Sequence, residues 1–228
     1  SVAKAVILDQ SPFYPQGGGQ AGDKGIIKLS SGAVCNVHSV KKNLQGQVLH
    51  YINEDFIDFK VDQEVHCIVE KSTRDLNSRA HSGGHLLDHA VEDLKLPLEV
   101  RGAYHFLPSP YVEYAFVDDS SIELNPEYLD ALKTNLEASA NLIVKAALPV
   151  TIYQGKVDDL PTWRQNLLPS AVKTGGVVRL VKFERDGFDP VPCSGTHVAN
   201  SADILPIRIK KISLNRTART IRVTYLLS

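Results

Sequence analysis

Methionine is absent from this 228-residue chain, cysteine occurs three times and tryptophan once. Because the first residue is Ser and no Met occurs, we expect the original start to have been processed or removed. Three cysteines are too few, and odd in number, for a disulfide framework, so we expect a reducing, cytoplasmic compartment. Cys35 and Cys67 lie in strand-like sequence, where a buried, unreactive thiol is expected.

Long apolar runs are also absent: none approaches the roughly 20 residues that a membrane-spanning helix needs. The chain shows no positively charged start followed by an apolar stretch, the pattern of a signal peptide. Its 25 basic and 26 acidic residues nearly cancel, which excludes a protein that coats nucleic acid by bulk charge but leaves room for a local basic face. Hydrophobic residues make up 43% of the chain, which predicts a packed globular core.

Residues 1–70 contain several segments with the pattern of β-strands. None of their segments with helical periodicity is long enough for a helix. The candidate strands, separated by Gly, Asn and Asp turn signals, are Val2–Leu8, Ala33–Val40, Val48–Ile52 and Val65–Val69. A glycine-rich loop, residues 11–23, follows the first of them. We therefore predict a small N-terminal β-barrel domain over residues 1–70.

The pattern changes at Ser72, which can cap a helix that ends before Pro97. A second helix is predicted from Asn125-Pro126 to Pro149, with Pro in the favourable first position. The strands predicted around and after these helices are 99–106, 111–117, 150–153, 177–183, 205–212 and 217–226. The predicted fold class is α+β in two parts: the barrel, followed by an α/β sandwich domain over residues 71–228 that holds a zinc site.

Two short motifs, His81-Ser-Gly-Gly-His85 and Cys193-Ser-Gly-Thr-His197, carry four side chains of the types that zinc prefers. Helical residues four apart project from one face, so the first two histidines can share an ion. His89 has the same spacing from His85. Because the apolar residues Ala90 and Val91 follow it, His89 is expected to be a packed or surface histidine and not a ligand. More than a hundred residues separate the motifs, so the fold must assemble the site. Thiolate and imidazole favour Zn²⁺ over Mg²⁺ or Ca²⁺.

These residues also carry a family resemblance. His81-Ser-Gly-Gly-His85-Leu-Leu resembles the H-x-x-x-H helix of the alanyl-tRNA synthetase editing domain, and Cys193-Ser-Gly-Thr-His197-Val resembles its C-x-G-T-H-V motif. Phe13-Tyr-Pro-Gln-Gly-Gly-Gly-Gln-Ala-Gly-Asp23 is similar to the glycine-rich segment that precedes that domain. Arg101-Gly-Ala-Tyr-His-Phe106 and Tyr111-Val-Glu-Tyr114 are similar to segments of free-standing members.

The resemblance covers nearly the whole chain, in the right order and spacing. It points to the free-standing alanyl-tRNA editing proteins of the AlaX kind, in the longer form that keeps the glycine-rich domain. Two positions depart from the pattern: Ser11 stands where such members often have Thr, and Ser194 where Gly is common.

This resemblance implies an ATP-independent hydrolase that cleaves the aminoacyl ester of seryl-tRNA(Ala), and in some members the glycyl form. It also implies that His81, His85, Cys193 and His197 bind zinc. An alanine pocket rejects serine poorly, because an added hydroxyl costs only on the order of 10²-fold. A second site that hydrogen-bonds the hydroxyl can reverse that preference.

The glycine-rich loop is expected to supply groups for such a site, because glycines let backbone N–H groups approach a ligand closely. The expected substrate contacts are Ser11, Gly17, Gly18, Gly19, Gln20, Asp23, His105 and Thr196. The loop lacks the Gly-Lys-Ser/Thr ending of a nucleotide-binding P-loop. Three glycines can equally form a tight turn between strands, and a strand histidine such as His105 can simply satisfy one hydrogen bond.

The role of the zinc stays open at this level. Four protein ligands are typical of a closed, structural site, whereas a catalytic zinc keeps one position open. Either the ion orients the tRNA 3′ end while neighbouring groups position the water, or one ligand such as His197 stays off and the ion activates the water. The first alternative is preferred.

Positive charge is concentrated at the end of the chain: residues 204–228 hold six basic residues and no acidic one. Strand periodicity places Arg208, Lys210 and Arg222 opposite the core. They are candidates for contact with the tRNA acceptor end, together with Arg74 and Arg79 on the first helix, although a merely solvated sheet face has the same pattern.

Three alternatives remain beside alanyl-tRNA editing. The chain could edit another mischarged tRNA, since a related domain occurs in threonyl-tRNA synthetase. It could be a zinc-stabilised RNA-binding module without catalysis, which needs no hydroxyl-reading loop. It could also be a zinc hydrolase of small esters, which needs an open metal position and no basic face.

Overall fold

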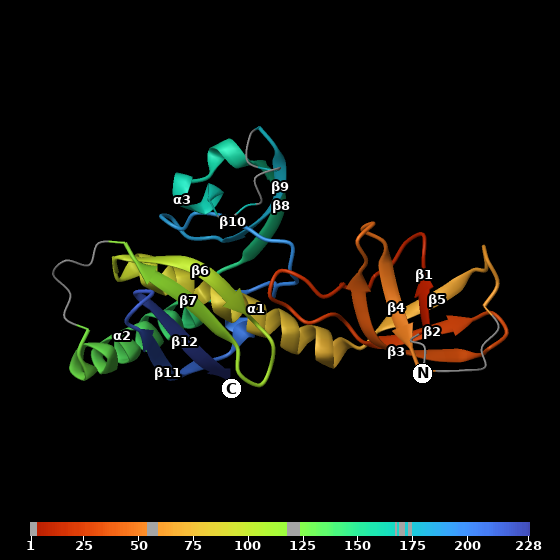
Figure 1. The fold of residues 1–228 in the computed structure, drawn as a ribbon, viewed down its shortest axis with the longest axis horizontal. Helices are drawn as coiled ribbons and strands as arrows, with labels where there is room; N and C mark the ends of the chain where they lie inside the picture. The colour runs from red at the N-terminus through yellow and green to blue at the C-terminus, as the bar shows by residue number, and fades with distance from the viewer. Residues whose placement is uncertain (1–3, 54–58, 118–123, 167, 169–171, 173–174) are drawn as a thin grey trace. The chain divides into compact units, whose positions relative to one another are not determined.

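The structure is a computed structural model that describes residues 4–53, 59–117, 124–166, 168, 172 and 175–228. The chain divides into two compact units, Ser1–Asn77 and Ser78–Ser228, and helix α1 (Lys71–Asp93) contributes to both (Figure 1). The first residues of the strand predicted at Val2–Leu8 lie outside the described residues.

The first unit is built on one antiparallel sheet with the strand order β1-β4-β3-β2-β5. Its strands are β1 (Lys4–Ile7), β2 (Gly25–Leu29), β3 (Val34–Lys42), β4 (Val48–Ile52) and β5 (Val65–Val69). In the described residues β1 pairs only with β4 and β5 only with β2. The predicted barrel is therefore not closed, because its two outer strands do not pair with each other. The sequence also failed to predict β2, which begins at Gly25, shortly after the glycine-rich loop.

Alternating side chains of the sheet form the core of this unit. Strand β3 alternates between exposed and buried positions over most of its length, as a strand with one covered face should. The buried apolar residues are Phe13, Ile27, Leu29, Cys35, Val37, Val40 and Ile52. Cys35 is buried, as expected, whereas Cys67 is only half-buried.

The second unit contains two further antiparallel sheets, with the strand orders β11-β12-β7-β6 and β10-β9-β8. Their strands are β6 (Leu98–Tyr104), β7 (Tyr111–Phe116), β8 (Val150–Lys156), β9 (Val177–Phe183), β10 (Val191–Pro192), β11 (Ile207–Asn215) and β12 (Thr220–Leu227). Every strand pair in the described residues is antiparallel. The α+β class is thus confirmed, but the sheets are not the parallel kind typical of an α/β sandwich.

Helices α1 and α2 (Pro126–Lys145) cover one face of the four-stranded sheet (Figure 1). Helix α2 begins as predicted: the Asn125 side chain accepts a hydrogen bond from the Tyr128 N–H, and Pro126 takes the first position. The shorter helical segments are η1 (Val157–Asp159), α3 (Thr162–Gln165) and η3 (Ser201–Ile204). The sequence did not predict them.

The buried side of α1 supplies Leu86, Leu87, Ala90 and Val91 to the main core. The same helix therefore anchors the fold and presents its polar residues at fixed positions. Among the described residues, no helix has both the length and the apolar character that a membrane crossing requires.

Candidate metal centre

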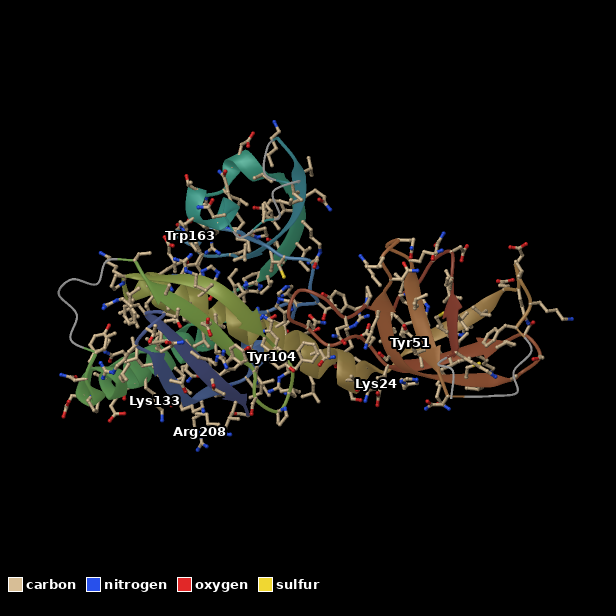
Figure 2. The ribbon with its side chains drawn as sticks, viewed as in Figure 1. Lys24, Tyr51, Tyr104, Lys133, Trp163 and Arg208 are labelled. Carbon is tan, nitrogen blue, oxygen red and sulfur yellow. The ribbon has the colours of Figure 1, made fainter. Side chains whose placement is uncertain are left out.

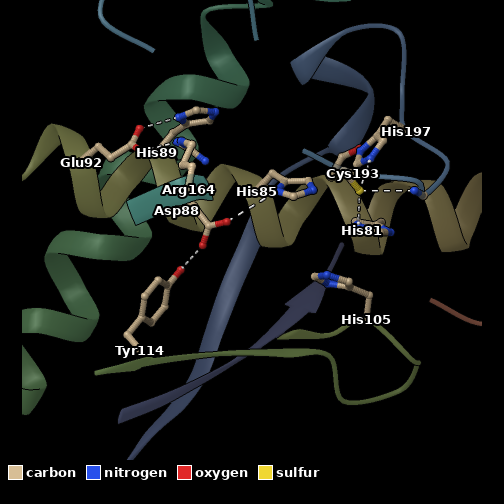
Figure 3. Close-up of polar contacts among 12 residues, drawn as sticks. His81, His85, Asp88, His89, Glu92, His105, Tyr114, Arg164, Cys193 and His197 are labelled. Carbon is tan, nitrogen blue, oxygen red and sulfur yellow. Dashed lines mark hydrogen bonds and ion pairs between the residues drawn. The ribbon is translucent and has the colours of Figure 1, made fainter. Parts of the chain in front are cut away.

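Helix α1 and the loop that follows β10 bring four metal-binding side chains together. His81 and His85 lie one turn apart on the helix, and Cys193 and His197 come from the loop. One ligand atom from each of the four lies within 4.8 Å of the others (Figure 3). The fold thus joins the two motifs that the sequence analysis singled out.

The Cys193 sulfur lies at the centre of this cluster. Its Sγ is 3.2 Å from the His81 Nε2 atom and 3.3 Å from the His197 Nε2 atom. The Gly195 N–H donates to the same sulfur over 3.3 Å. A Gly-containing loop allows this turn of the backbone toward the sulfur. The backbone N–H stabilises a thiolate at this position.

The outer nitrogens of the histidines are held by polar neighbours. The His197 Nδ1 atom is 3.1 Å from the Ser82 Oγ atom, and the His85 Nδ1 atom is 3.5 Å from an Asp88 carboxylate oxygen. The Tyr114 hydroxyl donates to the other Asp88 oxygen over 2.8 Å (Figure 3). Partners of this kind fix which ring nitrogen faces a metal.

Both ring nitrogens of His85 are buried and lack a hydrogen bond of good geometry. An unsatisfied buried imidazole costs free energy, and a metal ion bound to its inner nitrogen would remove that cost. The donor set of three imidazoles and one thiolate matches the tetrahedral sites of zinc. The residues therefore fit a metal ion, and thiolate with imidazole is the chemistry that zinc prefers.

The charges within the cluster differ strongly between its members. Burial lowers the pKa of His81 and His197 well below the usual value, and the neighbouring positive groups lower it further. Burial would also lower the pKa of His85, but its contacts with Asp88 and Cys193 raise it to about 9. Burial would raise the pKa of Cys193, yet His85, the Gly195 N–H and Arg179 lower it. Without an ion, these opposite shifts favour the charged forms of both side chains, a proton on His85 and a thiolate at Cys193.

His105 stacks directly on the cluster, with its ring centroid 4.2 Å from that of His81. The Tyr225 hydroxyl donates to the Ala80 carbonyl over 2.5 Å, so it can only accept from the His105 Nδ1 atom, 3.2 Å away. Nδ1 therefore carries the proton and Nε2 is a lone-pair acceptor. Burial lowers the pKa of His105 to about 3, which keeps this imidazole neutral. A Cβ atom at Gly84 would overlap the His105 ring.

Arg179 of β9 was not predicted from the sequence. Its Nη1 atom donates to the Cys193 carbonyl over 2.7 Å, and its own carbonyl accepts from the Cys193 N–H over 3.0 Å. Its charge contributes to lowering the pKa of His81, Cys193 and His197. Arg179 comes close to the Cys193 motif through the short pairing of β9 with β10. This is a tertiary contact, so no spacing in the sequence indicates it.

Asp88, Tyr114 and Ser82 were missed as well. Asp88 could have been found, since a carboxylate three residues after a helical histidine lies on the same face, and metal-bound histidines usually have such a partner. His89 does not join the cluster: its Nδ1 atom lies 2.8 Å from Glu92, and its ring stacks on Phe188 at 4.1 Å. It is a packed histidine, as expected.

In the first unit the glycine-rich loop closes a tight turn. The Gln20 N–H donates to the Gly17 carbonyl over 2.9 Å, and Gly18 and Gly19 have φ values of 54° and 73°, which glycine adopts readily. Gln20 is buried. A tight turn is the alternative to a substrate-binding loop that the sequence left open. A role of these glycines in substrate binding stays a prediction.

Asp23 and Ser11, also in this loop, have partners inside the first unit. Asp23 is fully buried, forms an ion pair with Arg74, and accepts from the Tyr14 N–H. Ser11 lies 2.6 Å from the His50 Nε2 atom, and the His50 Nδ1 atom lies 3.0 Å from the Val6 carbonyl. Since Nδ1 must donate to that carbonyl, the Ser11 hydroxyl donates to Nε2.

The remaining predicted contacts lie in the second unit. Ser78 donates to the Thr196 hydroxyl over 2.7 Å, within the loop that carries Cys193 and His197. Arg79 donates to the carbonyls of Ile204 and Ser228. Arg208 and Lys210 are exposed on β11, and Arg208 points away from the sheet (Figure 2).

The fold and the cluster together define an α+β protein with a buried to half-buried site of three histidines and one cysteine. Residues 1–73 match the family of class II (A) tRNA synthetases. The chain is 30% identical over 199 residues to the alanine–tRNA ligase of Oceanobacillus iheyensis, covering 87% of this chain and 21% of the ligase. It is 29% identical over 205 residues to the alanyl-tRNA editing protein AlaX-L of Pyrococcus horikoshii, covering 90% of this chain and 46% of that protein.

The chain therefore spans about a fifth of the length of the ligases and a little under half that of the editing protein. A further ligase, from Christiangramia forsetii, is 29% identical over 206 residues. These likenesses confirm the resemblance drawn from the motifs: over most of its length the chain is similar to an alanyl-tRNA editing protein and to a part of alanine–tRNA ligases.

Proposed function

We propose that this chain is an aminoacyl-tRNA deacylase that hydrolyses the ester of seryl-tRNA(Ala), without ATP. The observation that carries the proposal is the cluster of His81, His85, Cys193 and His197, in a chain similar to an alanyl-tRNA editing protein over 90% of its length. We assign hydrolysis to an editing domain formed by residues 71–228. Residues 1–70 form the glycine-rich domain of this proposal.

The four clustered side chains would hold a zinc ion. When bound, the ion would supply positive charge close to the terminal ribose and its ester. Four protein ligands would leave no open position for water on the ion, which favours an orienting role over direct activation of water. The work of positioning water then falls to neighbouring protein groups.

His105 is suited to that task. It is neutral, and its Nδ1–H is occupied by Tyr225. Its Nε2 atom has no hydrogen-bond partner in the described part of the chain and is not among the fully enclosed polar atoms. The free lone pair can therefore accept a hydrogen bond from a water or from the substrate ammonium group. Thr196, between Cys193 and His197 in the loop after β10, is the second polar contact that we assign to the substrate.

Selection of serine over alanine is assigned to the glycine-rich loop, through Ser11, Gln20 and the backbone of residues 17–19. Because Ser11 donates its hydrogen to His50, its oxygen is left as an acceptor. It already accepts from the Phe13 N–H over 3.2 Å, and one further lone pair remains. An acceptor is what a serine hydroxyl needs, and alanine offers nothing to fill it. Asp23, held by Arg74, supports the loop.

Contact with tRNA is assigned to the basic strands. Arg208 and Lys210 are exposed, and no carboxylate pairs with them in the described residues. Arg222 is less available, because it pairs with Glu113 at 3.0 Å and lies 4.1 Å over the Tyr111 ring. Reversing the charge of Arg208 should therefore weaken tRNA binding more than reversing Arg222, and the difference should shrink at high salt.

A deacylation panel tests the function. Purified protein should release serine from seryl-tRNA(Ala) and leave alanyl-tRNA(Ala) largely intact, with glycyl-tRNA(Ala) and seryl-tRNA(Thr) as further substrates. His81→Ala should lose both metal and hydrolysis, whereas His66→Ala, at an exposed position on β5, should lose neither. Equal rates on the seryl and alanyl esters would contradict editing.

The closed ligand set also supports a rival, a zinc-stabilised RNA-binding module without catalysis. The same panel separates the two functions. Tight tRNA binding by metal-loaded protein, with no hydrolysis of any mischarged tRNA, would favour the binding module.

A further inference from the structure

Arg179 is a cation beside the metal-type cluster, and it has no ionic partner in the part of the chain that the structure describes. Its Nη1 atom is used by the Cys193 carbonyl, but no carboxylate pairs with it among the residues that the structure describes. Its other nitrogens have no hydrogen-bond partner there, and they are absent from the fully enclosed polar atoms. Arg179 is half-buried. The donors on these other nitrogens are therefore in contact with solvent.

Holding a carbonyl does not require this charge. A single neutral N–H could also bind the Cys193 carbonyl, and a guanidinium offers five donors in a planar fork. With zinc bound, the ion, the Cys193 thiolate, the Asp88 carboxylate and Arg179 sum to about one positive charge. Asp88 lies behind His85, against Tyr114, so the excess positive charge is on the Cys193 side.

We propose that Arg179 binds an anionic oxygen of the RNA substrate, namely the phosphodiester before its 3′-terminal nucleotide. This rests on the proposed function for the identity of the substrate, although it concerns binding rather than hydrolysis. The cluster would receive the terminal ribose and its ester. The last phosphodiester is the nearest fixed negative charge to that ribose, and a planar guanidinium binds phosphate through two parallel hydrogen bonds.

The test uses the full chain, loaded with zinc, and a short fluorescent RNA that ends in CCA with a free 3′ hydroxyl. Affinity is measured by anisotropy for the natural RNA and for one whose last linkage is an uncharged methylphosphonate. Arg179→Gln is compared with wild type. The control is Arg185→Gln, since Arg185 lies just beyond β9 but already pairs with Asp93 at 2.7 Å.

For wild type, we expect removal of the charge from the last linkage to weaken binding about tenfold, as for one charge-assisted contact. Arg179→Gln should weaken binding of the natural RNA by a similar factor and bind both RNAs alike. The slope of log affinity against log salt should fall by about 0.7, the value for one phosphate on a single strand. Arg185→Gln should bind as wild type does.

Wild-type affinity of Arg179→Gln, or an equal further loss on the uncharged RNA, would overturn the proposal. A fall in kcat for seryl-tRNA(Ala) with unchanged RNA affinity would place the charge at the reacting ester and overturn the assignment to phosphate. If Arg179→Gln loses its metal, metal-free wild type and metal-free variant are compared, and they must still differ. Absence of hydrolysis with Arg179-dependent RNA binding intact would refute the deacylase function alone.

Discussion

The Asp88 carboxylate lies one helical turn beyond His85, 3.5 Å from its Nδ1 atom, with the Tyr114 hydroxyl on its other side. This contact orients the His85 ring so that its second nitrogen faces Cys193. Asp88 is buried, and it is itself held in place. The metal-type cluster is therefore supported from the core of the second unit and not only by the four side chains that would bind the ion.

Asp88→Asn should weaken zinc affinity by about 10- to 100-fold, the usual effect of losing such a partner. The variant keeps the size of the side chain but removes the charge that supports the imidazole. Competition with a coloured chelator measures the change. Asp93→Asn is the matched control, because Asp93 is on the same helix and, among the described residues, its ion-pair partner is the exposed Arg185. Equal affinities of the two variants would contradict a role for Asp88.

Metal affinity should rise with pH up to about 9. The contacts with Asp88 and Cys193 raise the pKa of His85 to about 9, so below that pH an incoming ion must displace a proton from His85. Each unit of pH should then change the affinity about tenfold for this one proton. Chelator competition between pH 6.5 and 9.5 measures the slope. Affinity that is independent of pH over this range would contradict a protonated His85 in the metal-free site.

The location of His105 gives a prediction for the metal-free protein. Its pKa is lowered to about 3, whereas an unfolded histidine has a pKa near 6.5. Between these values the unfolded chain binds more protons than the folded chain. The contribution of neutral His105 to the free energy of unfolding is therefore fully present above about pH 6.5, and it is lost as the pH is lowered toward 3. Denaturant titrations at several pH values should show a smaller fall for His105→Gln than for wild type. Unchanged pH dependence would contradict a buried neutral His105.

Gly84→Ala tests the same histidine from the helix. A Cβ atom at Gly84 would overlap the His105 ring, so the ring must leave its place on His81 or the helix must shift. We expect a loss of about 1–3 kcal/mol, typical of overpacking, together with weaker zinc affinity. Gly102→Ala is the control, since a Cβ atom there meets nothing within 4 Å. Denaturant midpoints and chelator competition report the two effects.

How far the sequence predicts this molecule depends on the range of each interaction. The helices at α1 and α2 and most strands follow from periodicity and caps, such as Asn125 before Pro126. The residue types in the two motifs, together with the family resemblance, also predict which four side chains meet. Closure of the first sheet could not be predicted, because it depends on whether β1 and β5 pair across the whole unit.

The surroundings of the site are set by tertiary contacts that leave little trace in the sequence. Arg179 reaches Cys193 through the pairing of only two residues of β10 with β9. Tyr225 fixes the proton of His105 from a strand 120 residues further along. By contrast Asp88 has a helical spacing from His85, so a search for outer partners of the predicted ligands would have found it.

The buried pair of Asp23 and Arg74 gives the last prediction, which separates support of the loop from direct substrate contact. Asp23 is fully buried, and the Arg74 guanidinium also donates to the Pro12 carbonyl over 2.8 Å. Arg74→Ala leaves the carboxylate without its cation, so we expect a loss of about 3 kcal/mol. Lys71→Ala removes an exposed pair with Asp75 on the same helix and should change stability by less than about 1 kcal/mol. Denaturant unfolding measures both. A stable Arg74→Ala protein that has lost only its discrimination between seryl and alanyl esters would instead place Asp23 and Arg74 in contact with the substrate.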